Sequence, residues 1–399
     1  MKLLDFGLST LGAAIATGSG YLLLFTLLSA RPREPAYGTP KHRFRIIVPA
    51  HNEQEGIAAT VSSLLDLDYP RELYDVQVVA DNCSDETARR AEEAGASVLI
   101  RSNERLRGKG YALLHAFEAL PDDLDTAMVI DADTVVSKNL LRAFAARLDV
   151  GAGAVQADYA VRNPNQTWRT RLIAIAFGSF HVVRSRARER LGLSCGLRGN
   201  GMCFTRNVLK NVPHQAFSIV EDVEYGIRLG EAGYRVHYAD EAHVYGEMVS
   251  TGAAARSQRQ RWEGGRRALA RAHGARLLRQ AWTRRDPVLL DLAFDVLIPP
   301  LSVLSSASLI GLLVSAAASA FGGGFGLSRA LFGFSSASLA AYVLRGWMVS
   351  GTGLRGLMTL AASPVYVVWK VAVRRERAAG EGEWVRTRRE QESEKSALG

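Results

Sequence analysis

Two aspartates that stand two positions apart, Asp131 and Asp133, have the types and spacing of a metal site. They follow the apolar run Met128–Ile130, and side chains two apart on an extended backbone point to the same side. Paired carboxylates that face one way suit Mg²⁺ or Mn²⁺ shared with a diphosphate, whose charge the metal would neutralise. The alternative, which is better for an isolated pair, is two solvated acids at the end of a strand.

A second acidic pair, Glu221-Asp222, opens the segment Val223–Ala232, whose pattern predicts a helix. The helix dipole favours negative charge in the first turn, so we expect these carboxylates to stay ionised. Ordinary N-terminal acids of a helix are the alternative. His243 could add a metal ligand to the first pair, but a lone histidine near a strand end is more often only hydrogen-bonded.

The pattern Q-x-x-R-W occurs at Gln258, Arg261 and Trp262. On a helix, residues three apart share a face, so the amide and the guanidinium could reach one ligand together. Arginine offers a bidentate fork for a pyrophosphate, and the indole ring offers an apolar platform. A basic amphipathic helix that lies on a membrane is the alternative, and the two interpretations are compatible.

Two short glycine-containing stretches complete the set of candidates. Gly199-Asn200-Gly201 precedes Glu221 by about twenty residues, and its glycines would let the backbone approach a ligand closely, although a plain turn explains them nearly as well. Lys109 stands between two glycines at the start of a predicted helix, where it could meet a phosphate. The stretch is too short for a Walker-type loop, because the first glycine and the hydroxyl residue are missing.

The order of these motifs carries more information than any one of them. Asp131-Ala132-Asp133, the glycine loop, Glu221-Asp222 and Q-x-x-R-W follow one another and are succeeded by long apolar segments. This arrangement resembles the family 2 glycosyltransferases, specifically the membrane-bound branch with the cellulose, chitin and hyaluronan synthases and the ceramide glucosyltransferases. The resemblance spans roughly residues 44 to 265 and the membrane topology around them.

The resemblance implies a role for each motif. Asp222 would be the general base that removes the proton from the acceptor hydroxyl, with Glu221 beside it, and a single displacement with one base implies inversion. Asp133 would be the more dependable metal ligand. Many relatives carry a second acid where this chain has Asn82, which leaves Asp81 as the expected contact to the nucleotide base. The residues implied in donor binding are Glu53, Asp81, Lys109, Asp131, Gln258 and Arg261, and those implied in acceptor binding are Gly199, Asn200, Gly201 and Trp262.

Alternating strand and helix signals must position these residues. They predict a mostly parallel sheet with helices on both faces, which the resemblance identifies with the Rossmann-like GT-A fold. Ligands of such sheets bind beyond the carboxyl ends of the strands, where His51-Asn52-Glu53, Asp81-Asn82 and Asp131-Ala132-Asp133 fall. The expected strands are Phe44–Pro49, Val76–Ala80, Val98–Arg101 and Ala127–Ile130, and the expected helices are Ile57–Leu67, Glu86–Ala94 and Gly110–Leu120.

Apolar segments predict an integral membrane protein. The uncharged run Leu8–Leu28 is long enough to span a bilayer, and the basic residues after it favour an anchor with an outside N-terminus over a cleaved signal peptide. Residues 296–320 and 327–349 are two further expected spans. A fourth span would place the basic tail outside, so we interpret 354–373 as interfacial or re-entrant, and Pro287–Val296 as interfacial.

These observations predict four regions in an inner (plasma) membrane protein. They are a transmembrane anchor at 1–30, a cytoplasmic catalytic domain at 31–285, interfacial and transmembrane helices at 286–375, and a basic cytoplasmic tail at 376–399. The net charge is +9, and the arginine-rich stretches at 184–190, 256–285 and 374–389 fall in the predicted cytoplasmic portion beside membrane segments, which favours anionic lipid headgroups over nucleic acid as the partner. The cysteines, Cys83, Cys195 and Cys203, are odd in number and match no zinc pattern, so we expect no disulfide framework.

Three functions are compatible with this sequence. A processive synthase would extend a β-linked polysaccharide or cell-envelope glycan and, with so few spans, would need an export partner or an oligomer. A single-addition enzyme would place one sugar on a polyprenyl phosphate or ceramide-like lipid. A non-catalytic nucleotide-sugar-binding protein is disfavoured, because every expected acid is present. The resemblance implies a UDP-sugar, GDP-mannose stays possible, and no motif reports the identity of the sugar.

Overall fold

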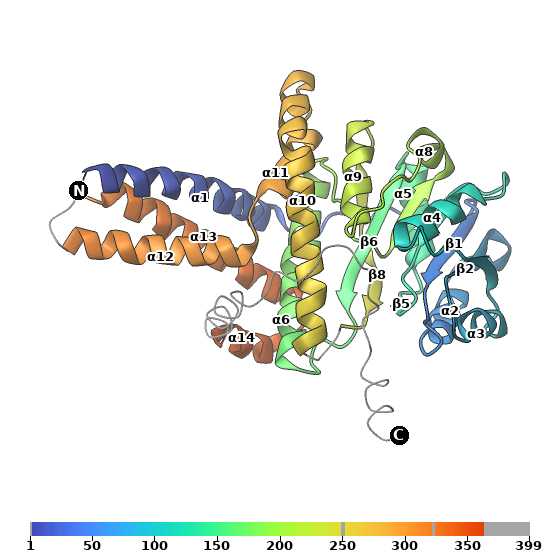
Figure 1. The fold of residues 1–399 in the computed structure, drawn as a ribbon. Helices are drawn as coiled ribbons and strands as arrows, with labels where there is room; N and C mark the ends of the chain where they lie inside the picture. Colours follow the sequence, from blue (N-terminus) through green and yellow to red (C-terminus); the bar gives the residue numbers. More distant parts are fainter. Residues whose placement is uncertain (1, 249–251, 321–323, 363–399) are drawn as a thin grey trace.

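The computed structural model describes residues 2–248, 252–320 and 324–362, and for residues 252–263 it describes the backbone alone. An eight-stranded sheet flanked by helices forms the body, from which a bundle of apolar helices projects (Figure 1). The strands are β1 (Phe44–Ala50), β2 (Tyr74–Asp81), β3 (Ser97–Arg101), β4 (Thr126–Val129), β5 (Thr134–Val136), β6 (Ala154–Val161), β7 (Met202–Thr205) and β8 (Val236–Gly246). The α-helices are α1 (Lys2–Leu28), α2 (Ile57–Leu65), α3 (Thr87–Glu93), α4 (Lys109–Glu118), α5 (Leu140–Asp149), α6 (Trp168–Phe177), α7 (Arg184–Arg190), α8 (Arg206–Asn211), α9 (Glu221–Glu231), α10 (Gly252–Arg284), α11 (Pro287–Leu297), α12 (Leu301–Ala320), α13 (Gly326–Val349) and α14 (Gly353–Ala361).

The half of the sheet that the sequence predicts is parallel. Strands β3, β2, β1 and β4 are neighbours in that order, and their register places Ala50 beside Ala80 and Ile47 beside Val129. Their apolar side chains are largely buried, as expected for parallel strands that are covered on both faces. The four predicted strands are confirmed, with boundaries that differ by one or two residues.

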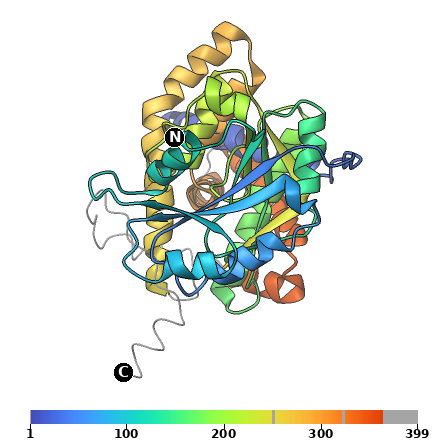
Figure 2. The ribbon, with the colours of Figure 1, turned by 90° about the vertical axis from the view of Figure 1, so that its right-hand side faces the viewer.

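Helices cover both faces of the sheet, as the alternating pattern predicts. On one face α2 and α5 pack against the strands through residues such as Val61 and Phe144. On the other face α4 and α9 do so through Leu113 and Tyr225. Figure 2 shows the blue helices α2 and α3 on one side of the sheet and the teal helix α4 on the other. Strands β1, β2 and β4 are therefore enclosed between two apolar layers, whereas the edge strand β3 is partly exposed.

The other half of the sheet is mixed, and the sequence patterns do not predict it. Strand β7 is antiparallel to β4 and β6, β8 is parallel to β6, and β5 is antiparallel to β8. Strands β5 and β7 are too short for a periodic pattern. Strand β8 is long but carries buried acids, and Glu241 is paired there with the buried Arg147 at 2.6 Å between Oε1 and Nη1. Because charged residues that are paired inside the protein interrupt the apolar pattern, hydrophobicity alone does not predict such a strand.

Three helices, α1, α12 and α13, are long and apolar enough to cross a membrane within the described part of the chain. They lie side by side on one side of the molecule, and α10 and α11 lie between them and the sheet (Figure 1). Small residues hold the bundle together: Gly12 faces Leu331, and Ser308 Oγ donates to the Phe332 carbonyl oxygen at 3.1 Å. The chain therefore carries candidate membrane helices at the places where the sequence predicts them.

The span expected at 296–320 begins later, at Leu301. Pro299 and Pro300 separate it from α11, because proline cannot continue a helix past its first turn. Of the segment 354–373, the structure describes α14, which is too short to cross a bilayer. The rest of that segment and the tail at 376–399 lie outside the described residues.

Candidate active site

The carboxyl ends of β1, β2 and β4 bring three acidic loops to one edge of the sheet, as predicted. The loop after β1, which contains Glu53, lies beside the loop after β2, because His51 Nδ1 is 2.7 Å from the Asp81 carbonyl oxygen. The parallel register of β1 with β4 places Asp131 and Asp133 at the same edge. This edge is where α/β sheets bind ligands.

Lys109 is at the centre of the site, at the first residue of α4. Its Nζ donates to the Asp131 carboxylate and to the Gly199 carbonyl oxygen. The start of α4 is fixed by close packing, because a Cβ at Gly110 would lie 2.1 Å from the Ala216 carbonyl oxygen. The glycine after Lys109 is therefore required for this approach, and it holds the ammonium between the strand end and the glycine loop.

The glycine loop adopts a backbone that its composition explains. Gly199 and Gly201 have φ of +78° and +72°, which side chains other than glycine rarely adopt. Asn200 between them is fully buried: its Nδ2 donates to Thr134 Oγ1 at 2.7 Å, and its Oδ1 accepts from the Asp131 backbone N–H at 3.1 Å. The Asn200 side chain is thus used within the protein, where it positions Asp131, and Gly199 is the member of the loop that borders the site.

The acidic pair lies against this loop. Glu221 and Asp222 are in the first turn of α9, and a Cβ at Gly199 would lie 3.5 Å from Asp222 Oδ2 and 3.6 Å from Lys109 Nζ. The fold therefore gathers Lys109, Asp131, Gly199 and Asp222, which are far apart in the sequence, around one point.

The surroundings shift the acid–base equilibria of this pair. Burial, together with the neighbouring charge of Asp222, raises the pKa of Glu221 to about 8, although Lys109 opposes the rise. Burial also raises the pKa of Asp222, against the opposing effects of a backbone N–H and nearby cations. The expectation that such acids simply stay ionised is therefore wrong for Glu221, because burial outweighs the helix dipole.

Carboxyl groups outnumber the cation that contacts them. Burial alone would lower the pKa of Lys109, but the charges of Asp131, Glu221 and Asp222 raise it, and the charges of Asp131 and Asp133 both act on Tyr159. Within the described residues, no group of three His, Cys, Asp or Glu side chains could hold a metal ion. Asp131 and Asp133, two residues apart, offer the oxygen donors that a hard cation takes when it binds one or two protein carboxylates and completes its shell with phosphates and water.

Tyr159 belongs to the site although the sequence analysis does not single it out. It lies on β6, and burial and the charges of Asp131 and Asp133 raise its pKa well above the ordinary value. Its ring stacks on His181, whose Nδ1 is 2.9 Å from the Tyr159 carbonyl oxygen. A lone tyrosine on an unpredicted strand carries no local signal, so only the fold could identify it.

His243 makes the hydrogen bond that the sequence analysis offers as the alternative to metal binding. Its Nδ1 is 3.0 Å from Asp158 Oδ2, and its backbone N–H donates to Ser137 Oγ at 2.9 Å. The hydrogen bond to Asp158 raises the pKa of His243. A histidine held in this way is occupied by a protein partner.

Two loop residues after β2 also have partners within the protein. Asp81 is buried and paired with Arg101, with 2.5 Å between Oδ1 and Nη1. Asn82 has φ of +51°, and its side chain accepts from the Asn103 backbone N–H at 2.7 Å. Asn82 thus shapes the loop that presents Asp81 at the edge of the sheet.

The Q-x-x-R-W segment lies in helix α10. The side chains of Gln258, Arg261 and Trp262 lie outside the described residues, so the structure does not place them. Beyond them in the same helix, Arg266 is described, and its Nη2 donates to the Asp295 carbonyl oxygen at 2.5 Å.

Comparison with known proteins gives a consistent picture. The family described as "Glycosyltransferase like family 2" matches residues 40–265. The chain is 29% identical over 270 residues to a beta-monoglucosyldiacylglycerol synthase of Trichormus variabilis, covering 63% of this chain and 57% of that protein. It is 25% identical over 233 residues to a poly-beta-1,6-N-acetyl-D-glucosamine synthase of Staphylococcus epidermidis, covering 56% of this chain and 55% of that protein. The chain thus spans a little over half the length of these curated relatives.

Among solved structures, the chain is similar to the mannosyltransferase PcManGT from Pyrobaculum calidifontis in complex with GDP-Man and Mn²⁺. The TM-score is 0.52 at 19% identity, and the likeness covers 85% of this chain and 98% of that one. At this level of identity the likeness shows a shared fold.

Proposed function

The chain belongs to the glycosyltransferase-like family 2 and has its GT-A fold, and on this premise we propose that it is an inverting enzyme that transfers one sugar from a nucleotide sugar to a lipid acceptor at the cytoplasmic face of a membrane. The observation that carries the proposal is the gathering of Lys109, Asp131 and Asp222 around Gly199. A diphosphate and an acceptor hydroxyl both need groups of these kinds within reach.

In this proposal Asp222 is the general base. Its carboxylate takes the proton of the acceptor hydroxyl while that oxygen forms a bond to the anomeric carbon, and the bond from this carbon to the diphosphate breaks on the opposite side. One displacement inverts the anomeric configuration. Gly199 leaves room for the acceptor beside Asp222, because no side chain projects from that position. Burial raises the pKa of Glu221 to about 8, and a protonated Glu221 would limit the negative charge next to the base.

The proposed donor site lies on the other side of Lys109. Asp131 and Asp133 would hold Mg²⁺ or Mn²⁺, which when bound supplies positive charge to the departing diphosphate. Lys109 now neutralises Asp131 and would turn from this carboxylate to the phosphates. Asp81 and Glu53 border the same edge, where we place the nucleotide base. We also keep Gln258, Arg261 and Trp262 as donor and acceptor contacts in this proposal.

A lipid acceptor suits the membrane part of the described chain. Its three candidate spans are few for a channel that would enclose a growing polymer. The similarity to a glucosyldiacylglycerol synthase also supports single addition, whereas the similarity to a polysaccharide synthase supports the second candidate, processive extension with an export partner or oligomer. Basic residues after α1 support a cytoplasmic catalytic domain.

Nucleoside diphosphate release by the detergent-purified chain tests this proposal. The assay uses a panel of UDP- and GDP-sugars with lipid extract, with and without Mn²⁺, and Asp222→Asn as the blank. We expect metal-dependent release with one donor, together with a small glycolipid product. Long polymer as the product would favour the second candidate, and the absence of both donor binding and release would overturn the enzyme assignment.

A further inference from the structure

A cluster of arginines lies where the apolar bundle meets the sheet domain. We call Arg184, Arg188, Arg198, Arg266, Asp291 and Asp295 the junction cluster. Three of its arginines are almost fully enclosed, and Arg266 is 25% exposed at its side chain. With four guanidinium groups against two carboxylates, the cluster holds more positive than negative charge in a region shielded from water. Buried charge without a partner is costly, so its purpose needs an explanation.

Three of the four arginines are paired. Arg188 contacts both carboxylates, with Nε 2.8 Å from Asp291 Oδ2 and Nη2 2.8 Å from Asp295 Oδ1. Arg184 Nη1 lies 3.1 Å from Asp295 Oδ1, and Arg266 Nη2 lies 3.2 Å from Asp295 Oδ2. Tyr21 of α1 donates to Asp291 Oδ1 at 2.7 Å, which joins the bundle to the cluster. Asp291 and Asp295 are therefore both already engaged by these partners.

Arg198 is the exception. Among the described side chains no carboxylate lies within ion-pair distance of it; its Nη2 donates to the Cys195 carbonyl oxygen at 2.8 Å, and its Nε has no hydrogen-bond partner. The guanidinium stacks on Phe180 at 4.5 Å from the ring centroid. Burial lowers the pKa of Arg198 to about 10. The fold thus holds an oriented cation whose anion is not part of the described protein.

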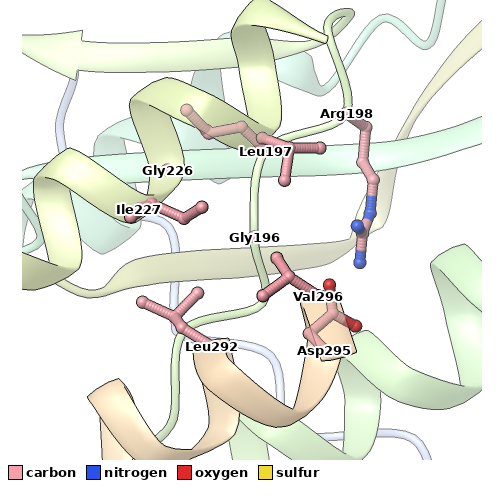
Figure 3. A pocket seen from close by; sticks show the side chains of 9 residues that line it. Gly196, Leu197, Arg198, Gly226, Ile227, Leu292, Asp295 and Val296 are labelled. Atoms are coloured by element: carbon pink, nitrogen blue, oxygen red, sulfur yellow. The ribbon is translucent and has the colours of Figure 1, made fainter. Parts of the chain in front are cut away.

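The position of Arg198 links the acid site to the bundle. It immediately precedes Gly199, which borders Asp222, and its charge opposes the rise in the pKa of Asp222. On its other side a pocket opens between the loop at 196–198, α9 and α11. Figure 3 shows the Arg198 guanidinium and Asp295 at one end of this pocket, and the apolar side chains of Ile227 and Leu292 along it.

We propose that Arg198 binds the phosphate of the lipid acceptor, so that the acceptor is a phosphate-bearing lipid. This inference rests on the proposed function: a phosphate oxygen would be the attacking atom in place of a hydroxyl, and Asp222 would take the proton that the monoanion of the phosphate still carries, since the second pKa of a phosphate monoester is about 6. The two surplus positive charges of the junction cluster match a phosphate monoester, which carries about two negative charges and accepts a bidentate guanidinium. The apolar side chains of Ile227, Leu292 and Val296 beside Arg198 would border the first part of the lipid chain.

The chemistry separates this assignment from donor binding. A donor diphosphate would meet Lys109 and Asp131 at the edge of the sheet, whereas Arg198 turns toward α11 and the bundle. Loss of Arg198 should therefore weaken binding of the acceptor and leave binding of the donor unchanged. If Arg198 has a purely structural role, its loss should weaken the binding of all ligands equally.

The test measures binding and turnover with matched lipids. Full-length protein in detergent is titrated with farnesyl phosphate, farnesol, and the nucleoside diphosphate of the preferred donor, and binding is followed by native mass spectrometry. The variants are Arg198→Met and Arg198→Lys, with Arg276→Met as the control, because Arg276 has one ion pair, to Glu231, and is 43% exposed.

We expect the wild-type protein to bind farnesyl phosphate more tightly than farnesol. Arg198→Met should lower the affinity for farnesyl phosphate about 10- to 100-fold. Arg198→Lys should retain part of the affinity, Arg276→Met all of it, and nucleotide affinity should stay unchanged in every variant. Equal affinity of wild type for both lipids, or a loss confined to the nucleotide, would overturn the inference.

The outcome also distinguishes this inference from the proposed function. Asp222-dependent turnover on farnesol or diacylglycerol, without a preference for phosphate, would leave the function standing and remove the phosphate site. Arg198-dependent binding of farnesyl phosphate without any Asp222-dependent turnover would support the site and count against the enzyme assignment.

Discussion

The acid site and the junction cluster carry opposite excess charges: the acid site has an excess of negative charge, and the junction cluster has an excess of positive charge. The acid site gathers Asp131, Glu221 and Asp222 around Lys109 at one edge of the sheet, with Asp133 two residues from Asp131. The junction cluster gathers four arginines around two aspartates in an enclosed space. One region would gain from a cation and the other from an anion.

The comparison shows that the burial of a charged group determines whether its partner is another residue of the protein or a ligand. In the enclosed junction, three arginines have partners in the chain, which fits a structural connection between the bundle and the sheet domain. At the acid site, the excess negative charge can be neutralised by a ligand that binds from solution. Arg198 belongs to the junction cluster and is buried, but its Nε has no hydrogen-bond partner, and it immediately precedes Gly199, which borders the acid site.

Replacement of the proposed base tests the acid site most severely. Asp222→Asn should lower kcat about 10²- to 10⁴-fold, because the acceptor proton then has no carboxylate to receive it. Thermal stability should be unchanged or higher, since the raised pKa of Asp222 means that ionisation is unfavourable in the folded state. The measurements are nucleoside diphosphate release and a melting curve. Wild-type turnover in a folded variant would refute the base assignment.

Two arginine variants compare a paired arginine of the junction cluster, Arg188, with the arginine that has no ion pair, Arg198. Arg188→Met leaves Asp291 and Asp295 without their shared partner, and we expect a loss of about 3–5 kcal/mol in the free energy of unfolding. Arg198→Met removes no ion pair and should leave this free energy unchanged or raise it. Chemical unfolding in detergent measures both. Similar losses in the two variants would show that Arg198 is structural.

The pH dependence of turnover tests the electrostatics of the acid site. Because the pKa of Asp222 is raised, activity should fall with decreasing pH earlier than for an ordinary aspartate, as the base becomes protonated. Lys109→Met removes a cation that lowers the pKa of both Glu221 and Asp222, so the acidic limb should move to higher pH whatever the height of the profile. A profile that keeps its position or moves to lower pH would contradict this electrostatic account.

The smallest expected effect concerns the glycine loop. Gly199→Ala places a side chain on a backbone with φ of +78°, which should cost about 1–2 kcal/mol in the free energy of unfolding. The added methyl also approaches Asp222 Oδ2 and should lower turnover further than the stability change explains. Gly151→Ala, with φ of +90° and open space around it, is the control for strain alone. Equal turnover in the two variants would remove Gly199 from the site.

The sequence predicts the parts of this site that obey local rules. Acids after parallel strands meet at one edge, and so Asp131, Asp133 and the loop at 51–53 are placed correctly. It does not reveal Tyr159 or Arg198, because their surroundings come from strands and helices that are distant in the chain. The ionisation of Glu221 is misjudged for the same reason, since burial is a property of the whole fold.

The mixed half of the sheet escapes prediction for a related reason. Strands β5 and β7 are short, and β8 buries charged residues whose partners, such as Arg147, lie elsewhere in the chain. The apolar spans are predicted well because length and hydropathy suffice for them, and their boundary at Leu301 differs only where Pro299 and Pro300 intervene.

The central claim is that the acid site is completed by a divalent cation and a diphosphate. Calorimetric titration of UDP and GDP into the purified chain, in Mn²⁺ and in EDTA, tests it most directly, with Asp131→Asn and Asp133→Asn as companions. We predict that one nucleotide binds at least about tenfold more tightly with Mn²⁺, which is about 1.4 kcal/mol, and that both variants lose this gain. Equal affinity in Mn²⁺ and EDTA, or an undiminished gain in the variants, would contradict the account.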